Sequence, residues 1–145
     1  MINQFTELSG EWIYRSFRNI TVPAQTLNDI LFGEGALSIS VGEDGFLQKS
    51  ELSFGPGYSM IVNGQAIIVS DNVFSFPPIA IEMKAFGIEG TDAAGWLYEY
   101  RGYLVPNWYN RKEQKTAIVG TVIRVVAHGA NSPAGYVASF VAVKK

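Results

Sequence analysis

The sequence predicts an all-β fold, namely a closed up-and-down antiparallel β-barrel of about eight strands. Fifteen glycines divide the chain into short apolar runs, a spacing typical of barrels and sandwiches rather than of alternating strands and helices. Short links favour pairing between strands that are neighbours in the sequence. A sheet of this many twisted strands tends to close, because closure removes its unpaired edges. A Greek-key β-sandwich is the alternative architecture.

Length and composition narrow the class of protein. Residues 1–145 are expected to form a single β-barrel domain. Because the chain has no cysteine, it has no disulfide framework, thiol nucleophile or cysteine zinc site. Its net charge of −2 comes with scattered basic residues that form no stripe for nucleic acid. No apolar run approaches the length of a membrane span and the first residues lack signal-peptide features, so we expect a cytoplasmic protein.

The first strand is expected over Gly10–Arg18, where side chains alternate between two faces. One face carries Trp12, Tyr14 and Ser16. Thr21–Gly35 contains a proline and two glycines, and it is predicted as a long connection. The best helix candidate, Gln25–Leu31, lies inside this connection and is too short to organise the fold.

The next two strands are predicted to form a hairpin. Ala36–Val41 and Phe46–Phe54 alternate apolar and polar residues. They flank Gly42–Gly45, whose Asp-Gly pair is among the strongest hairpin signals. In Phe46–Phe54 the alternation places Phe46 and Leu52 on the same face.

A second hairpin is predicted about the Asn63-Gly64 pair. Its strands would cover Tyr58–Val62 and Gln65–Ser70. After two consecutive prolines, Ile79–Gly90 again alternates apolar and charged residues and is expected to form the following strand.

The remaining strands are expected over Gly95–Val105, Thr116–His128 and Tyr136–Val143. Pro106–Lys115 is predicted as a polar loop between the first two of them. The whole set amounts to eight or nine strands, joined mostly by short links.

Two pairs of opposite charges alternate with inward-facing residues on neighbouring strands. Glu99 and Arg101 share one face of a strand, and Glu82 and Lys84 share one face of the strand before it. We expect these side chains to point outward, where such pairs contribute little to stability. Pointing inward, they would line a polar lumen.

Six aromatic residues form the candidate ligand site, because Trp and Tyr offer flat apolar faces with a hydrogen-bonding tip. They are Trp12, Tyr14, Trp96, Tyr98, Tyr100 and Trp108. Such a set suits an aromatic or amphipathic small molecule, with no cofactor expected. The alternative is that these rings simply fill the lumen.

Arg124 joins the candidate site because it interrupts an apolar run, where an isolated charge is costly to bury. It could bind a ligand carboxylate, pair with a neighbouring strand or cap the barrel beneath Trp12. The single histidine, His128, has no cysteine or serine-elbow partner and is interpreted as a turn residue at a strand end. No catalytic residue and no metal site is predicted.

The opening Gly10-Glu11-Trp12 resembles the Gly-x-Trp start of calycin-type barrels, and the strand order up to Gln65 is closer to avidins than to lipocalins. The resemblance implies that Trp12 packs beneath a late-strand cation, for which Arg124 is the first candidate and Lys144 the second. The serine, threonine and tryptophan set that holds biotin in avidins is not found here, so biotin is not expected. Avidins assemble through their barrel walls.

The last two strands predict a partner subunit. Residues 116–128 and 135–143 are apolar on nearly every position, whereas an antiparallel strand with one wet face alternates. The barrel interior covers only one face, so a homodimer or homotetramer through these strands would cover the other.

The leading functional prediction is a non-catalytic barrel that binds a small aromatic or amphipathic molecule. A calycin-like enzyme, assisted by Glu99, Arg124 or a tyrosine, is one alternative. An oligomeric assembly or protein-interaction module with a filled lumen is the other.

Overall fold

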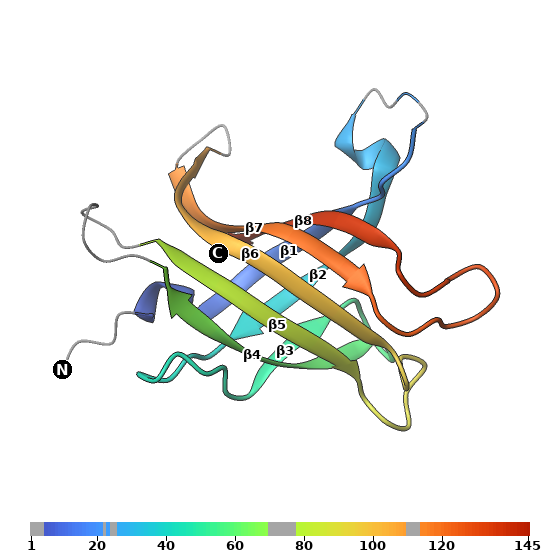
Figure 1. Cartoon of the computed structure of the whole chain (residues 1–145), viewed down its shortest axis with the longest axis horizontal. Helices are drawn as coiled ribbons and strands as arrows, with labels where there is room; N and C mark the ends of the chain where they lie inside the picture. The colour runs from blue at the N-terminus through green and yellow to red at the C-terminus, as the bar shows by residue number, and fades with distance from the viewer. Residues whose placement is uncertain (1–4, 22, 24–25, 70–77, 110–113) are drawn as a thin grey trace.

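In the computed structural model the chain forms one closed antiparallel β-barrel (Figure 1). The structure describes residues 5–21, 23, 26–69, 78–109 and 114–145, without the side chains of 107–109. The strands are β1 Gly10–Phe17, β2 Leu31–Ile39, β3 Ser50–Ser53, β4 Ser59–Ile68, β5 Ile79–Gly87, β6 Leu97–Tyr109, β7 Gln114–Arg124 and β8 Val137–Lys144. Two 3₁₀ turns, η1 Thr6–Leu8 and η2 Leu27–Ile30, lie outside the sheet. Within these described ranges no helix is long and apolar enough to cross a bilayer.

Each strand pairs with its sequence neighbours, and β8 pairs back onto β1 to close the sheet. The closing register runs from Trp12 opposite Lys144 to Phe17 opposite Ser139. This confirms the predicted up-and-down barrel of eight strands and excludes the Greek-key sandwich. An eight-stranded barrel is just wide enough for side chains to fill, so the inward faces of the strands form the core.

The predicted alternation of faces holds in β1 and β6. Tyr14 is 2% exposed, whereas its neighbour Ile13 is 46% exposed. Likewise Tyr100 is 3% exposed inside the barrel and Tyr103 is 58% exposed outside it. The period of two along each strand therefore separates lumen from surface as expected.

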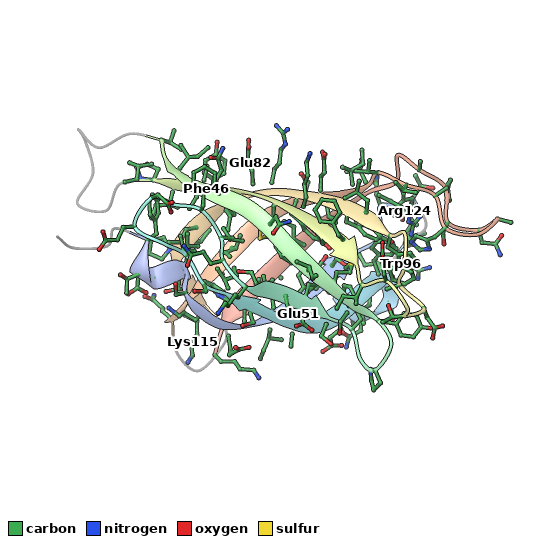
Figure 2. The ribbon with its side chains drawn as sticks, turned by 90° about the horizontal axis from the view of Figure 1, so that it is seen from below. Phe46, Glu51, Glu82, Trp96, Lys115 and Arg124 are labelled. Carbon is green, nitrogen blue, oxygen red and sulfur yellow. The ribbon has the colours of Figure 1, made fainter. Side chains whose placement is uncertain are left out.

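The N-terminal segment closes one end of the barrel. Leu8 in η1 is fully buried, and the Trp12 Nε1–H donates to its carbonyl oxygen at 3.0 Å. The Lys144 ammonium lies 5.7 Å from the centre of the Trp12 ring, a cation–π contact. The cation that packs on Trp12 is therefore Lys144, and the first expectation, Arg124, is wrong. Because β7 and β8 are antiparallel, Arg124 lies at the opposite, open end (Figure 2).

The predicted hairpin about Asn63-Gly64 is wrong, because β4 runs through both residues without a break. Gly64 does not form a turn; its lack of a side chain allows β4 to approach β5 closely. A Cβ atom at this position would lie 2.0 Å from the carbonyl oxygen of Glu82 on β5. Only glycine fits there at the observed strand spacing.

The strand β2 starts earlier than predicted. The expected helical turn is a single 3₁₀ turn, η2, held by a capping box between Thr26 and Asp29. The strand begins directly after it at Leu31 and includes the glycines that were interpreted as loop residues. A Cβ on Gly35 would lie 2.3 Å from the Ser53 carbonyl oxygen, so this glycine permits β2 to approach β3.

The predicted strand Phe46–Phe54 is regular only over Ser50–Ser53. Lys49 has a φ of 47°, which breaks the strand and reverses the alternation before it. Leu47 is consequently buried, while Phe46 is 54% exposed and does not share the inward face of Leu52.

Both β6 and β7 extend into the predicted polar loop Pro106–Lys115. The pairing register shifts between Val105 and Trp108, which forms an irregularity at the position of Pro106. Proline has no N–H to give to the ladder, and such a shift lets a strand continue past it.

Candidate functional site

A hollow of about 290 Å³ opens at the end of the barrel opposite Trp12. We call it the aromatic hollow; it is lined by Tyr14, Ser16, Phe32, Gly33, Glu34, Phe54, Tyr58, Trp96, Tyr98, Tyr100, Arg124 and His128. Figure 2 shows Trp96 and Arg124 together at this end. Its volume is close to the lower limit of ordinary ligand pockets. The site would therefore suit a small molecule.

The floor of the hollow is a packed cluster of rings. Tyr14 stacks on Phe140 with 5.8 Å between ring centres and meets Tyr100 edge-on at 5.8 Å. The Tyr14 hydroxyl donates to the Tyr100 hydroxyl at 3.3 Å. Burial raises the pKa of Tyr14 to about 12 and holds the pKa of Tyr100 well above 10, so both phenols are neutral at physiological pH.

The rim is built on Trp96, which lies just before β6. The ring of His128 stacks on it with a centre-to-centre distance of 4.2 Å and an interplanar angle of 15°. The ring of Tyr58, just before β4, also lies near Trp96, with 5.7 Å between the ring centres. Three separate connections of the barrel therefore meet in one half-buried aromatic wall.

Arg124 ends β7 and is 5% exposed. Its Nε–H donates to the Tyr98 hydroxyl at 3.1 Å, and its Nη1 donates to the Pro133 carbonyl oxygen at 3.2 Å. The rings of Phe32 and Tyr136 lie 5.3 and 5.5 Å from the guanidinium carbon. Cation–π contacts and two hydrogen bonds thus hold the guanidinium in a fixed place beside the hollow.

His128 continues the same hydrogen-bond chain. Its Nε2 lies 2.7 Å from the Tyr98 hydroxyl oxygen. Burial and, second, the nearby charge of Arg124 lower the pKa of His128 below its usual 6.5. Because the ring is then neutral near pH 7 and Arg124 already donates to Tyr98, the Tyr98 O–H donates to Nε2.

The structure brings together five of the seven residues predicted as a ligand site. The five that line the aromatic hollow are Tyr14, Trp96, Tyr98, Tyr100 and Arg124. Trp12 belongs to the closed end and does not line the hollow. The side chain of Trp108 lies outside the described residues.

Sequence reasoning missed seven of the twelve residues that line the aromatic hollow, four of which carry a ring: Phe32, Phe54, Tyr58 and His128. His128 was interpreted as a turn residue. Nothing in the sequence indicates that its ring stacks on Trp96, which lies 32 residues earlier in the chain. Phe32 lay inside the predicted connection, where Gly33 and Gly35 obscure the alternation. Phe54 and Tyr58 lie at the two ends of the short link between β3 and β4. This shared position was the one signal in the sequence that the two rings lie at the same end of the barrel.

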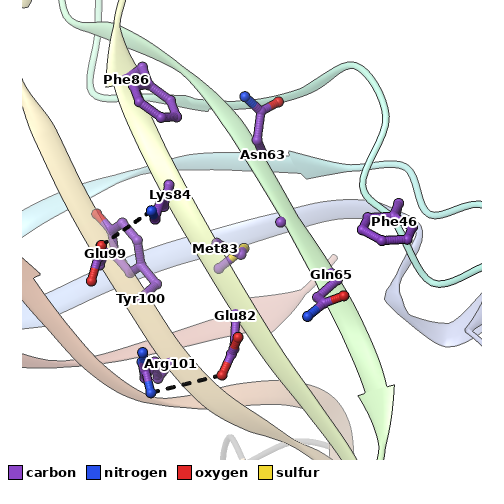
Figure 3. Close-up of a pocket in the computed structure, with 11 residues that line it drawn as sticks. Phe46, Asn63, Gln65, Glu82, Met83, Lys84, Phe86, Glu99, Tyr100 and Arg101 are labelled. Atoms are coloured by element: carbon purple, nitrogen blue, oxygen red, sulfur yellow. Dashed lines mark ion pairs between the residues drawn. The ribbon is translucent and has the colours of Figure 1, made fainter.

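A second, larger hollow of about 610 Å³ lies over the outer face of β4, β5 and β6 (Figure 3). Its charges are already paired: Lys84 with Glu99 at 3.6 Å and Arg101 with Glu82 at 3.9 Å. These pairs confirm that the alternating charges point outward. Glu99, which could assist catalysis only from an inward position, is therefore on the outer face. Exposed pairs of this kind contribute little energy, and the hollow holds no buried polar group that a ligand would satisfy.

No protein-family model, no curated protein and no solved structure matches this chain. The class of the protein therefore rests on its own geometry. The closed barrel of eight antiparallel strands, with aromatic residues inside, is consistent with a calycin-type barrel.

Proposed function

We propose that this protein is a non-catalytic barrel that binds a small aromatic molecule in the aromatic hollow. The observation that carries the proposal is the convergence of aromatic faces, one buried cation and hydroxyl groups on a single hollow at the open end. Apolar walls with a few placed polar groups are what small-molecule sites share.

The packing of the lumen supports a site at the mouth rather than in the centre. Leu37, Met60, Ile81 and Ile118 are each at most 1% exposed and belong to the packed core of the barrel. A barrel with an entirely filled lumen would suit an assembly module. Here the filling stops at the ring cluster of Tyr14, and the space above it stays open.

The test uses 2-naphthamide, a neutral bicyclic probe, in calorimetric titrations. The ligand efficiency of compounds this small places the expected dissociation constant between about 10 µM and 1 mM. Trp96→Leu removes an aromatic wall, and one ring contact is worth about 1 kcal/mol, so binding should weaken about fivefold. Tyr103→Leu, an aromatic substitution on the outer face, is the matched control and should change little. Equal weakening in both variants, or no binding of naphthalene probes, contradicts the proposal.

We further propose that two copies of this chain associate through the outer face of β7 and β8. The outward residues of this face are apolar or hydroxyl-bearing, without a charge between Ala117 and Ile123 or between Val137 and Val143. Val137, for example, is 42% exposed. An uncharged apolar face is self-complementary, which a two-fold contact requires. The likeness to avidins, which assemble through barrel walls, points the same way.

Sedimentation equilibrium at micromolar concentration tests the association. One chain has a mass of 15.9 kDa, so a homodimer doubles that mass and a tetramer quadruples it. A mass of 15.9 kDa at this concentration contradicts the proposal.

A further inference from the structure

Arg124 is a buried cation that forms no ion pair with the residues that the structure describes. Among the described residues, no carboxylate lies within 4.0 Å of the Arg124 guanidinium. Its contacts are aromatic faces, a tyrosine hydroxyl and a backbone carbonyl. None of these groups carries a formal charge, and a buried charge is normally paired.

The guanidinium also keeps donors for another group. It has five N–H donors, of which Nε uses one on Tyr98 and Nη1 uses one on Pro133. The Nη2 amino group has no hydrogen-bond partner among the residues that the structure describes, and Arg124 lines the aromatic hollow. The side chain therefore presents both charge and unused donors to a molecule that enters there.

We infer that the aromatic hollow takes a planar aromatic carboxylate, with the carboxylate on Arg124 and the ring against Tyr14, Phe54 and Trp96. This inference rests on the proposed binding function and names its ligand class. A carboxylate matches a guanidinium in charge and can accept two parallel N–H bonds, and such charge-assisted bonds are the strong ones. Fixing of the guanidinium by Tyr98 and flanking rings reduces the ordering cost on binding.

Glu34 is the one acid among the residues that line the hollow. It lies at the exposed rim on β2, with no ion pair to Arg124. Its negative charge would weakly oppose an anionic ligand, because water screens charges at an exposed site. Glu34→Gln should therefore bind the carboxylate as tightly as the wild type or slightly more tightly.

The experiment compares 2-naphthoate with 2-naphthamide, which have the same rings and nearly the same shape but differ in charge. In the wild type we expect 2-naphthoate to bind about tenfold or more tightly, the range for a hydrogen bond to a charged group. Arg124→Met, which keeps a long apolar side chain, should reduce the difference to about threefold or less by weakening 2-naphthoate alone. Arg124→Lys should restore part of the preference.

The outcomes separate this inference from the proposed function. Binding of 2-naphthamide that Trp96→Leu weakens, with 2-naphthoate no tighter in the wild type, overturns the carboxylate inference and leaves the binding function standing. Binding of neither compound overturns both. Because the wild-type comparison decides on its own, the inference stays testable even where Arg124→Met does not fold.

Discussion

The buried tyrosines at the floor of the aromatic hollow should make the protein sensitive to alkaline pH. Folding raises the pKa of Tyr14 from 10 to about 12 and that of Tyr100 well above 10, in both cases mainly through burial. The folded state therefore holds protons that the unfolded chain releases above pH 10. The stability that comes from this difference is complete below pH 10 and is lost as the pH rises towards the folded pKa.

The size of the effect follows from the pKa values. One pH unit above the unfolded pKa, a tyrosine that stays neutral in the folded state has lost about 1 kcal/mol of its contribution to stability. Tyr14 alone should lower the free energy of unfolding by about 1 kcal/mol between pH 9 and pH 11. Tyr100 should change it in the same direction. Tyr14→Phe removes the contribution of Tyr14, so the stability of this variant should fall less than that of the wild type over this interval.

Urea unfolding at pH 9, 10 and 11, with tyrosinate absorbance followed in parallel, measures this dependence. Tyr103→Phe on the outer face is the control, and it should show the wild-type dependence because its ring contacts water when folded. If Tyr14→Phe loses as much stability as the wild type between pH 9 and 11, the burial of the hollow's floor is not what the structure indicates.

Three further perturbations test other parts of the account. His128 is the only histidine in the chain, so proton NMR reports its pKa directly. We expect a value below 6.5 that rises in Arg124→Met, because this variant removes the positive charge near the ring. An unchanged pKa in that variant would contradict the influence of the Arg124 charge on His128. Gly64→Ala places a Cβ against a backbone oxygen and should cost about 3 kcal/mol or more of unfolding free energy. A cost near 1 kcal/mol is the penalty for a left-handed residue in a turn, and it would favour a hairpin at this position. Val141→Glu on the outer face of β8 should reduce the sedimentation mass to 15.9 kDa, whereas Ile61→Glu on β4 should not. Equal effects of the two variants would place the contact between subunits away from β7 and β8.

The barrel class could be predicted from the sequence because it depends on features that repeat along the chain. Alternation in β1 placed Tyr14 inside, and alternation in β6 placed Tyr98 and Tyr100 inside and Glu99 outside. Each of these assignments needs only the period of two and the rule that apolar faces are buried. Tyr14, Tyr98 and Tyr100 of the candidate site face the lumen for the same reason, since they lie on regular strands.

What the sequence could not show depends on distances between segments. In the sequence, Gly64 cannot be told from a turn glycine. The carbonyl oxygen of Glu82, which leaves no room for a side chain at Gly64, belongs to another strand. Arg124 and Lys144 both end late strands, and only the antiparallel direction of β7 and β8 decides which end of the barrel each one reaches. His128 lies in the connection after β7, and the alternation of residues along strands does not predict the path of a connection.

The most direct test of the account is where a bound aromatic carboxylate lies. Intermolecular nuclear Overhauser effects from 2-naphthoate can be measured to the aromatic protons of the protein. We predict contacts to the rings of Trp96 and His128 at the open end of the barrel. Contacts confined to Phe46 and Phe86, which border the larger outer hollow, would contradict the assignment of the binding site.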